Sequence, residues 1–223
     1  MDMEAPENSG NDFISKNRLE ALVDGVFAFA MTLLVVGLDV PTIPKAEAAA
    51  ELPKYLLTMW PQFLSFIIAF FILASFWIVH HEHFHFLHSV DKIVLWLNVL
   101  ILIFVVLVPF STNLTGDYSH VQIANLVFHF NMLILGLLFL IQWQYIIRCP
   151  SLLNGPVHPD RVLDSSLDRI SIITAACVGI VLSLTFSPFS MLAYLIVPIA
   201  IRILIWIFNP RTRPFGRAKT NAP

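Results

Sequence analysis

Long runs of apolar residues separated by short polar segments dominate the sequence. Each run is long enough to cross about 30 Å of hydrocarbon as an α-helix. Helices are expected at residues 16–40, 53–83, 91–112, 121–148, 166–186 and from the turn at Ser187-Pro188 to Phe208. The pattern therefore predicts an all-α polytopic membrane protein with six transmembrane helices.

The polar residues at the two ends of the chain set the predicted domain limits. Residues 1–15 contain Pro and Gly and are expected to form a disordered N-terminus, and residues 209–223 form a basic tail. Residues 16–208 remain as a single six-helix transmembrane domain. Charged residues make up 13% of the chain, whereas a soluble domain carries about a quarter. The net charge of −2 gives no sign of a nucleic-acid partner.

Lys and Arg residues are distributed unevenly between the two predicted sides of the membrane. One side carries only Lys45 and Lys54. The side that bears both termini carries eleven, namely Lys16, Arg18, Lys92, Arg148, Arg161, Arg169, Arg202, Arg211, Arg213, Arg217 and Lys219. Because Lys and Arg are enriched in cytoplasmic segments, both termini are expected in the cytoplasm, with the protein in the cell membrane.

The first helix has two chemically different faces. Asp24 lies about two turns into this apolar run and needs a partner in protein or water, because a buried carboxylate is costly in a membrane. Helical geometry places Asp24 nearly opposite Phe29. One apolar face is shared by Phe29, Thr32, Leu33, Val36 and Val40. Taken alone, this face is explained by ordinary helix packing.

Histidines gather at the end of the second helix, in the run His80-His81-Glu82-His83-Phe84-His85 that continues to His88. Imidazoles suit zinc or copper, but the cysteines lie elsewhere in the chain and Glu82 is the only carboxylate in the run. Hydrogen bonds between helices are the favoured interpretation, and no metal or other cofactor is expected. His129 lacks a second axial ligand at its depth, which argues against haem. The absence of a nucleophile beside a base argues against an enzyme.

A resemblance to a known family begins in the first helix. The helix resembles the signature of the prokaryotic homologues of the animal endolysosomal potassium channel at Arg18, Asp24-Gly25 and Thr32-Leu33-Leu34. This sequence departs from that signature at Leu22 and Val23. The segments Trp77 to His81 and Trp96-Leu97-Asn98 to Phe110 resemble the family's next two helices.

The resemblance implies a potassium-preferring cation channel in the lipid bilayer. It implies a homotetramer in which the first helix lines a central pore, with potassium ions as the permeant partner. The implied constriction consists of Phe29, Leu33 and Val36, with Thr32 as a polar neighbour. The implied structural polar network contains Arg18, Asp24, Trp77, His80, His81 and Asn98. The sequence contains no Thr-Val-Gly-Tyr-Gly run, so no carbonyl filter of the usual kind is expected.

The alternative function is a secondary transporter or metal-ion exporter. Six helices and a histidine run are compatible with it. Such an exporter needs His and Asp ligands near the membrane midplane, however, and the fifth helix contains no Asp, Glu or His between Ile170 and Phe186. A channel is therefore the favoured hypothesis.

Overall fold

The computed structural model describes residues 15–155 and 159–208. In this part of the chain, the structure contains seven α-helices. They are α1 (Lys16–Val36), α2 (Ala48–Thr58), α3 (Trp60–Phe86), α4 (Lys92–Asp117), α5 (Gln122–Arg148), α6 (Pro159–Thr185) and α7 (Ala193–Phe208). The expected all-α class is confirmed. The predicted terminal segments, 1–15 and 209–223, lie outside the described residues except for Ser15.

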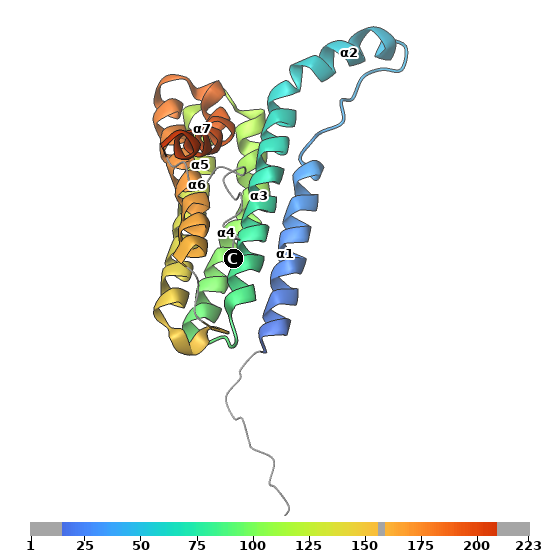
Figure 1. Ribbon diagram of the computed structural model, residues 1–223. Coiled ribbons are helices and arrows are strands. Elements are labelled where there is room, and N and C mark those ends of the chain that lie inside the picture. Colours follow the sequence, from blue (N-terminus) through green and yellow to red (C-terminus); the bar gives the residue numbers. More distant parts are fainter. Residues whose placement is uncertain (1–14, 156–158, 209–223) are drawn as a thin grey trace, which may run out of the picture.

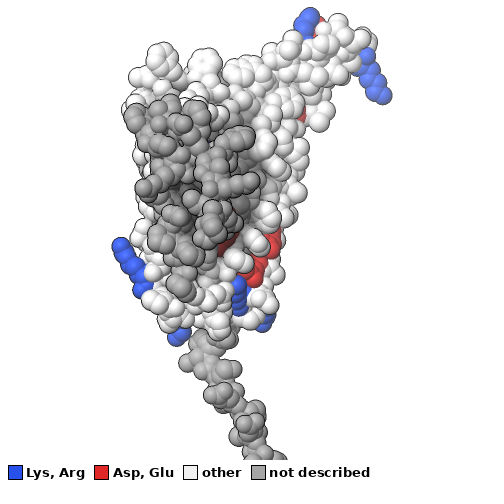
Figure 2. All heavy atoms as spheres, in the orientation of Figure 1, with Lys and Arg blue, Asp and Glu red and all other residues white. Residues whose placement is uncertain are grey.

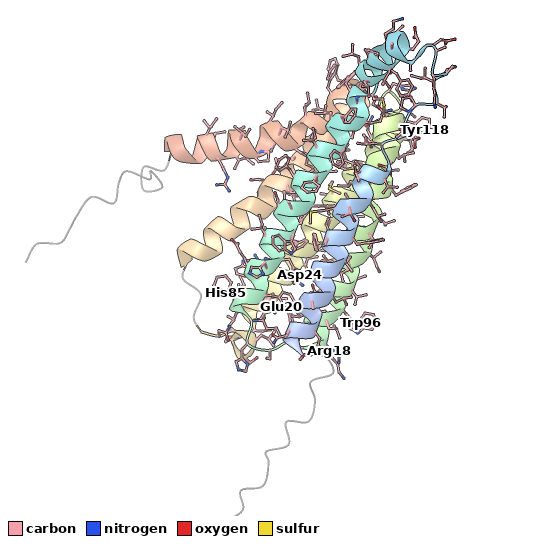
Figure 3. The ribbon with its side chains drawn as sticks, turned by 90° about the vertical axis from the view of Figure 1, so that its right-hand side faces the viewer. Arg18, Glu20, Asp24, His85, Trp96 and Tyr118 are labelled. Carbon is pink, nitrogen blue, oxygen red and sulfur yellow. The ribbon has the colours of Figure 1, made fainter. Side chains whose placement is uncertain are left out.

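Helices α1, α3, α4, α5 and α6 run lengthwise beside one another (Figure 1). Helix α1 packs on α3 and α4, and α5 packs between α4 and α6. Helix α2 leans away from the bundle, and α7 lies across it, being seen end-on in Figure 1 and lengthwise in Figure 3. Among the described residues, α1, α3, α4 and α5 are long and apolar enough to cross a membrane. Shorter apolar stretches cover Ile170–Thr185 and Pro188–Leu204, so six crossings remain a prediction.

The predicted boundaries of the first three helices differ from those in the structure. Helix α1 ends at Val36 instead of residue 40, because its C-cap Gly37 is a poor helix former and Pro41 disfavours helical backbone at residue 40. The side chain of Asn113 lies where a Cβ at Gly37 would be, only 2.0 Å from that position. The second predicted helix is two helices that meet at Met59. Pro61 explains this break, since proline disfavours helical backbone in the residues before it.

The third predicted helix continues past residue 112 to Asp117 because its polar residues find acceptors locally. The hydroxyl groups of Ser111 and Thr112 donate to the carbonyl of Val108, and that of Thr115 donates to the carbonyl of Ala124. Serine and threonine inside apolar helices commonly satisfy their hydroxyls in this way. A polar stretch at this point therefore does not end the helix.

The Lys and Arg side chains visible in Figure 2 lie toward the ends of the molecule, near the lower end of the bundle and on the α2 arm. Asp and Glu side chains lie just above the lower group, beside the region drawn in grey. The large exposed side chains between these ends are apolar, among them Phe71, Ile103, Phe110 and Ile141. This distribution suits a protein whose middle lies in hydrocarbon.

Helices α5 and α6 approach each other closely at one glycine. A Cβ at Gly179 would lie 2.5 Å from the imidazole of His129, whereas a Cβ at Gly25 on α1 would have no atom within 4 Å. We expect Gly179→Ala to lower the free energy of unfolding by at least about 1 kcal/mol through overpacking. Gly25→Ala should instead leave it unchanged or raise it, because alanine favours helix. Thermal unfolding in detergent followed by tryptophan fluorescence measures both, and equal effects at the two sites would contradict the prediction.

Candidate functional site

Helix α1 divides sharply into a buried face and an exposed face. The buried residues are Leu19, Val23, Phe27, Ala30 and Leu34, which recur at spacings of three and four and so form one stripe. This stripe fills the groove between α3 and α4. On the opposite side of the helix, most residues are exposed in the single chain.

The four residues assigned to the constriction lie mostly on that uncovered surface. Phe29 is 62% exposed and Val36 is 72% exposed. Thr32 is exposed too, and its hydroxyl donates to the carbonyl of Phe29 at 2.8 Å. Leu33, in contrast, is half-buried. Packing inside one chain therefore does not account for Phe29, Thr32 or Val36; lipid, water or a second copy of the chain has to cover them.

Asp24 lies on the edge of α1 that faces α3. Its carboxylate accepts a hydrogen bond of 2.8 Å from the indole N–H of Trp77. The Trp77 ring is also tilted against the ring of His81, with centroids 6.1 Å apart. Figure 3 shows Glu20 and Asp24 on this side of α1, with Arg18 at the start of the helix. Arg18 is exposed, and its side chain makes no hydrogen bond or salt bridge with any described residue.

A second polar contact is buried between α3 and α4. His80 Nε2 and Asn98 Oδ1 are 2.8 Å apart, and both residues are almost fully buried. Because the amide oxygen only accepts, the imidazole donates from Nε2. The ring of His80 stacks on Phe84 with centroids 4.3 Å apart. The structure thus arranges five of the six residues assigned to the polar network in two contacts, and it leaves Arg18 apart from both.

The histidine run does not converge on one point. His80 and His83 are buried, whereas His81, His85 and His88 are exposed. The ring of His83 stacks on Trp143 of α5 and lies 3.2 Å from Gln142 Oε1. Among the side chains that the structure describes, no three His, Cys, Asp or Glu residues are grouped in a way that could hold a metal ion.

Sequence reasoning missed a polar contact where α1 begins. The ammonium group of Lys16 donates to the carbonyl of Leu87, which also accepts from the side-chain amide of Asn154. Asn154 lies in a loop rich in proline and glycine, where asparagine is common for local turns. No spacing rule connects it with α1, so the contact becomes visible only in the folded chain.

Comparison with known proteins gives consistent matches. Residues 18–109 match the family model described as endosomal/lysosomal potassium channel TMEM175. A potassium channel from Streptomyces collinus is 33% identical over 63% of this chain and 68% of its own length. A potassium channel from Chamaesiphon minutus is 33% identical over 75% of this chain and 76% of its own length. The endosomal/lysosomal proton channel TMEM175 of Gallus gallus is 29% identical over 48% of this chain but only 22% of its own length.

Solved structures give the same fold. The crystal structure of a potassium-selective TMEM175 homologue from Chamaesiphon minutus superposes with a TM-score of 0.70 at 26% identity, covering 85% of this chain and 97% of that one. A variant of the potassium channel MtTMEM175 superposes with a TM-score of 0.55 at 14% identity, covering 94% and 98% of the two chains. The second likeness concerns the fold alone.

Proposed function

This chain belongs to the TMEM175 family of ion channels, and on that premise we propose that it forms a potassium-preferring channel in the cell membrane. Residues 16–208 form the channel domain in this proposal. The family match covers nearly all of α1, which holds the candidate pore residues, together with all of α3 and most of α4. Two bacterial relatives of comparable length are potassium channels. None of the comparisons favours a transporter or a metal-ion exporter.

The observation that carries the proposal is the uncovered apolar face of α1. A single helix cannot enclose a water-filled path, so several copies must surround an axis, and closed cyclic symmetry is the usual arrangement of identical chains. We propose four copies. Each exposed position on α1 then becomes a ring, with Phe29 and Val36 facing inward and Leu33 and Thr32 beside them.

Such a ring selects ions by the cost of removing their water, because it has no oxygen ligands. Apolar side chains offer no oxygen atoms to replace the hydration shell of an ion, so a narrow ring empties of water and blocks current. A wider ring passes ions that keep part of their water. Potassium holds its water less tightly than sodium, and a ring that forces partial dehydration therefore favours potassium. Asp24 points toward Trp77 instead, which gives it a structural role in this proposal.

Liposome flux measurements test the function directly. The purified protein, reconstituted in liposomes with a potassium gradient, should carry potassium driven by the membrane potential, faster than sodium and without saturation or a counter-ion. Mass measurement in nanodiscs should give four chains for the active species. Saturable flux that requires a counter-ion would support a transporter, and an active monomer or dimer would contradict the four-copy pore.

Six crossings and cytoplasmic termini are part of the same proposal. In this proposal α6 supplies the fifth crossing. The sixth comes from the apolar stretch containing α7, which lies across the bundle in the single chain and has to turn lengthwise to cross the membrane. In a protein whose two cysteines, Cys149 and Cys177, are replaced by serine, we expect a membrane-impermeant thiol reagent to label Ala48→Cys from outside. Asn17→Cys at the start of α1 should stay protected, and a fluorescent protein fused to the C-terminus should remain on the same side as Asn17. The reverse labelling, or ends on opposite sides, would contradict the topology.

A further inference from the structure

One backbone carbonyl connects the first turn of α1 with a distant loop. The carbonyl oxygen of Leu87 accepts a hydrogen bond of 2.8 Å from Lys16 Nζ and one of 3.1 Å from Asn154 Nδ2. Leu87 is the C-cap of α3, directly after its last residue, Phe86. Lys16 precedes Leu87 by 71 residues and Asn154 follows it by 67. Three separate parts of the chain therefore meet at this atom.

Asn154 captures the end of α3 with several bonds. Its side-chain amide also donates to the carbonyl of His85 at 3.1 Å, and its backbone N–H donates to the carbonyl of Phe86 at 2.9 Å. The N–H of the neighbouring residue His88 donates to the carbonyl of Leu152 at 2.7 Å. The last carbonyls of a helix lack partners within the helix, so this loop fixes their direction. Lys16 adds a positive charge at the negative end of the α3 dipole.

An apolar contact accompanies the polar one. Leu19 of α1 is buried in a small cluster separate from the main core of the bundle. The other buried members of this cluster are Phe84, Leu87, Val94, Ile146 and Leu152. Leu87 and Leu152 come from the same two segments that Asn154 joins. The loop thus supports the start of α1 from both a polar and an apolar side.

Within the part of the chain that the structure describes, the first turn of α1 has few other contacts to hold it. Ser15 precedes the helix but makes no side-chain capping bond, and such caps otherwise stabilise a helix start by about 1 kcal/mol. Asn17 and Arg18, on the side away from the bundle, are exposed. Uncapped helix ends open easily. The position of this turn therefore depends on Lys16 and Leu19.

We propose that Lys16 and Asn154 form a clasp on the Leu87 carbonyl that sets the position of α1, so that Asn154 acts as a positioning residue for the ion path. The clasp acts from residues that do not touch the exposed face of α1. Its effect on conduction rests on the proposed channel function, whereas its effect on the first turn of α1 does not. Both residues act through one acceptor, so their effects are not independent.

Hydrogen exchange measured by mass spectrometry tests the clasp without any assumption about conduction. One hydrogen bond contributes about 1 kcal/mol, which corresponds to about a fivefold change in a local opening equilibrium. Lys16→Met and Asn154→Ala should each speed exchange in the peptide containing Arg18 and Leu19 by up to that factor. The double variant should exchange at the same rate as Lys16→Met, because without the Lys16 bond the first turn of α1 is no longer connected to Asn154. Lys16→Arg should restore the parent rate.

Two controls separate the clasp from general effects. Lys54→Met removes a lysine that pairs with Glu51 on α2 at 2.7 Å and should leave exchange at the start of α1 unchanged. Unaltered exchange in α5 shows that each variant is folded. If Asn154→Ala fails this check, Asn154→Ser is used in place of it, because serine keeps a donor on a shorter side chain. Parental exchange in Lys16→Met, or a double variant whose effect is the product of the single effects, would overturn the proposal.

Single-channel recording gives the second readout. Lys16→Met and Asn154→Ala should shift the open probability in the same direction by up to about fivefold, with parental thermal stability. Asn154→Ala changes no charge, so a shared effect does not come from the potential at the pore mouth. Unchanged open probability in both variants would overturn the effect on conduction. A parent protein that carries no current would refute the proposed function and leave the exchange result standing.

Discussion

Replacing Phe29 with asparagine should raise the potassium current of the reconstituted protein by at least about tenfold, equivalent to about 1.4 kcal/mol in favour of the wetted pore. The side chain is 62% exposed in the single chain, so the change removes little packing within the fold. In a ring of four copies, it replaces four apolar groups with amides that hold water. Selectivity for potassium over sodium should fall, because the ring then demands less dehydration.

A matched control lies two residues away on the same helix. Phe27 is fully buried in the core between α1 and the bundle. Phe27→Asn should cost about 3–5 kcal/mol, the range for truncating a buried phenylalanine, and yield little folded protein. The two variants have the same chemistry and differ only in which face of α1 they change.

For both variants, assembly and current have to be measured on the same protein. Size-exclusion chromatography in detergent reports assembly, and flux or planar-bilayer recording reports current and the potassium-to-sodium preference. If Phe29→Asn assembles normally and leaves current and preference at the parent level, α1 does not line the pore. If it abolishes assembly as Phe27→Asn is expected to, the exposed face is a contact between chains.

Asn98→Leu should lower the free energy of unfolding by about 1–3 kcal/mol, the cost of leaving a buried polar group without its partner. Asn98 is fully buried and its amide oxygen lies 2.8 Å from His80 Nε2. Leucine has a similar size, so the main loss is the acceptor for the imidazole N–H. No large cavity accompanies the change.

The double variant His80→Phe with Asn98→Leu provides the decisive comparison. Replacing both partners of a buried hydrogen bond by apolar groups of similar shape is close to neutral. The double variant should therefore be more stable than Asn98→Leu alone, as judged by thermal unfolding in detergent. Asn17→Ala, at an exposed position, is the control and should have no effect. If the double variant loses the sum of the two single effects, the contact contributes little to stability.

The sequence was sufficient for the parts of the fold that depend on local patterns. Apolar runs located α1, α3, α4 and α5, since a membrane-spanning helix is defined by its own length and composition. The opposition of Asp24 and Phe29 follows from helical geometry alone, and in the structure Asp24 contacts Trp77 while Phe29 is exposed.

Features that depend on two distant segments could not be predicted in this way. The side chain of Asn113 lies close against Gly37, just after the end of α1, and no periodicity encodes this contact. The contacts of Asn154 could not be predicted either, because an asparagine in a loop does not indicate which helix end it will cap. Asn98 could be assigned a need for a partner, but only the packed helices identify His80 as that partner.

Helix α1 lies against α3 and α4, whereas α5 and α6 extend the bundle on the far side of α4. The family match ends at residue 109, within α4, so it covers the groove that holds α1 and little beyond it. The turn between α4 and α5 is therefore a suitable junction for chimeras of two family members. Such a chimera would keep α1 and the groove between α3 and α4 from one family member and take its outer helices from another. Inheritance of ion preference could then be assigned to one half of the chain.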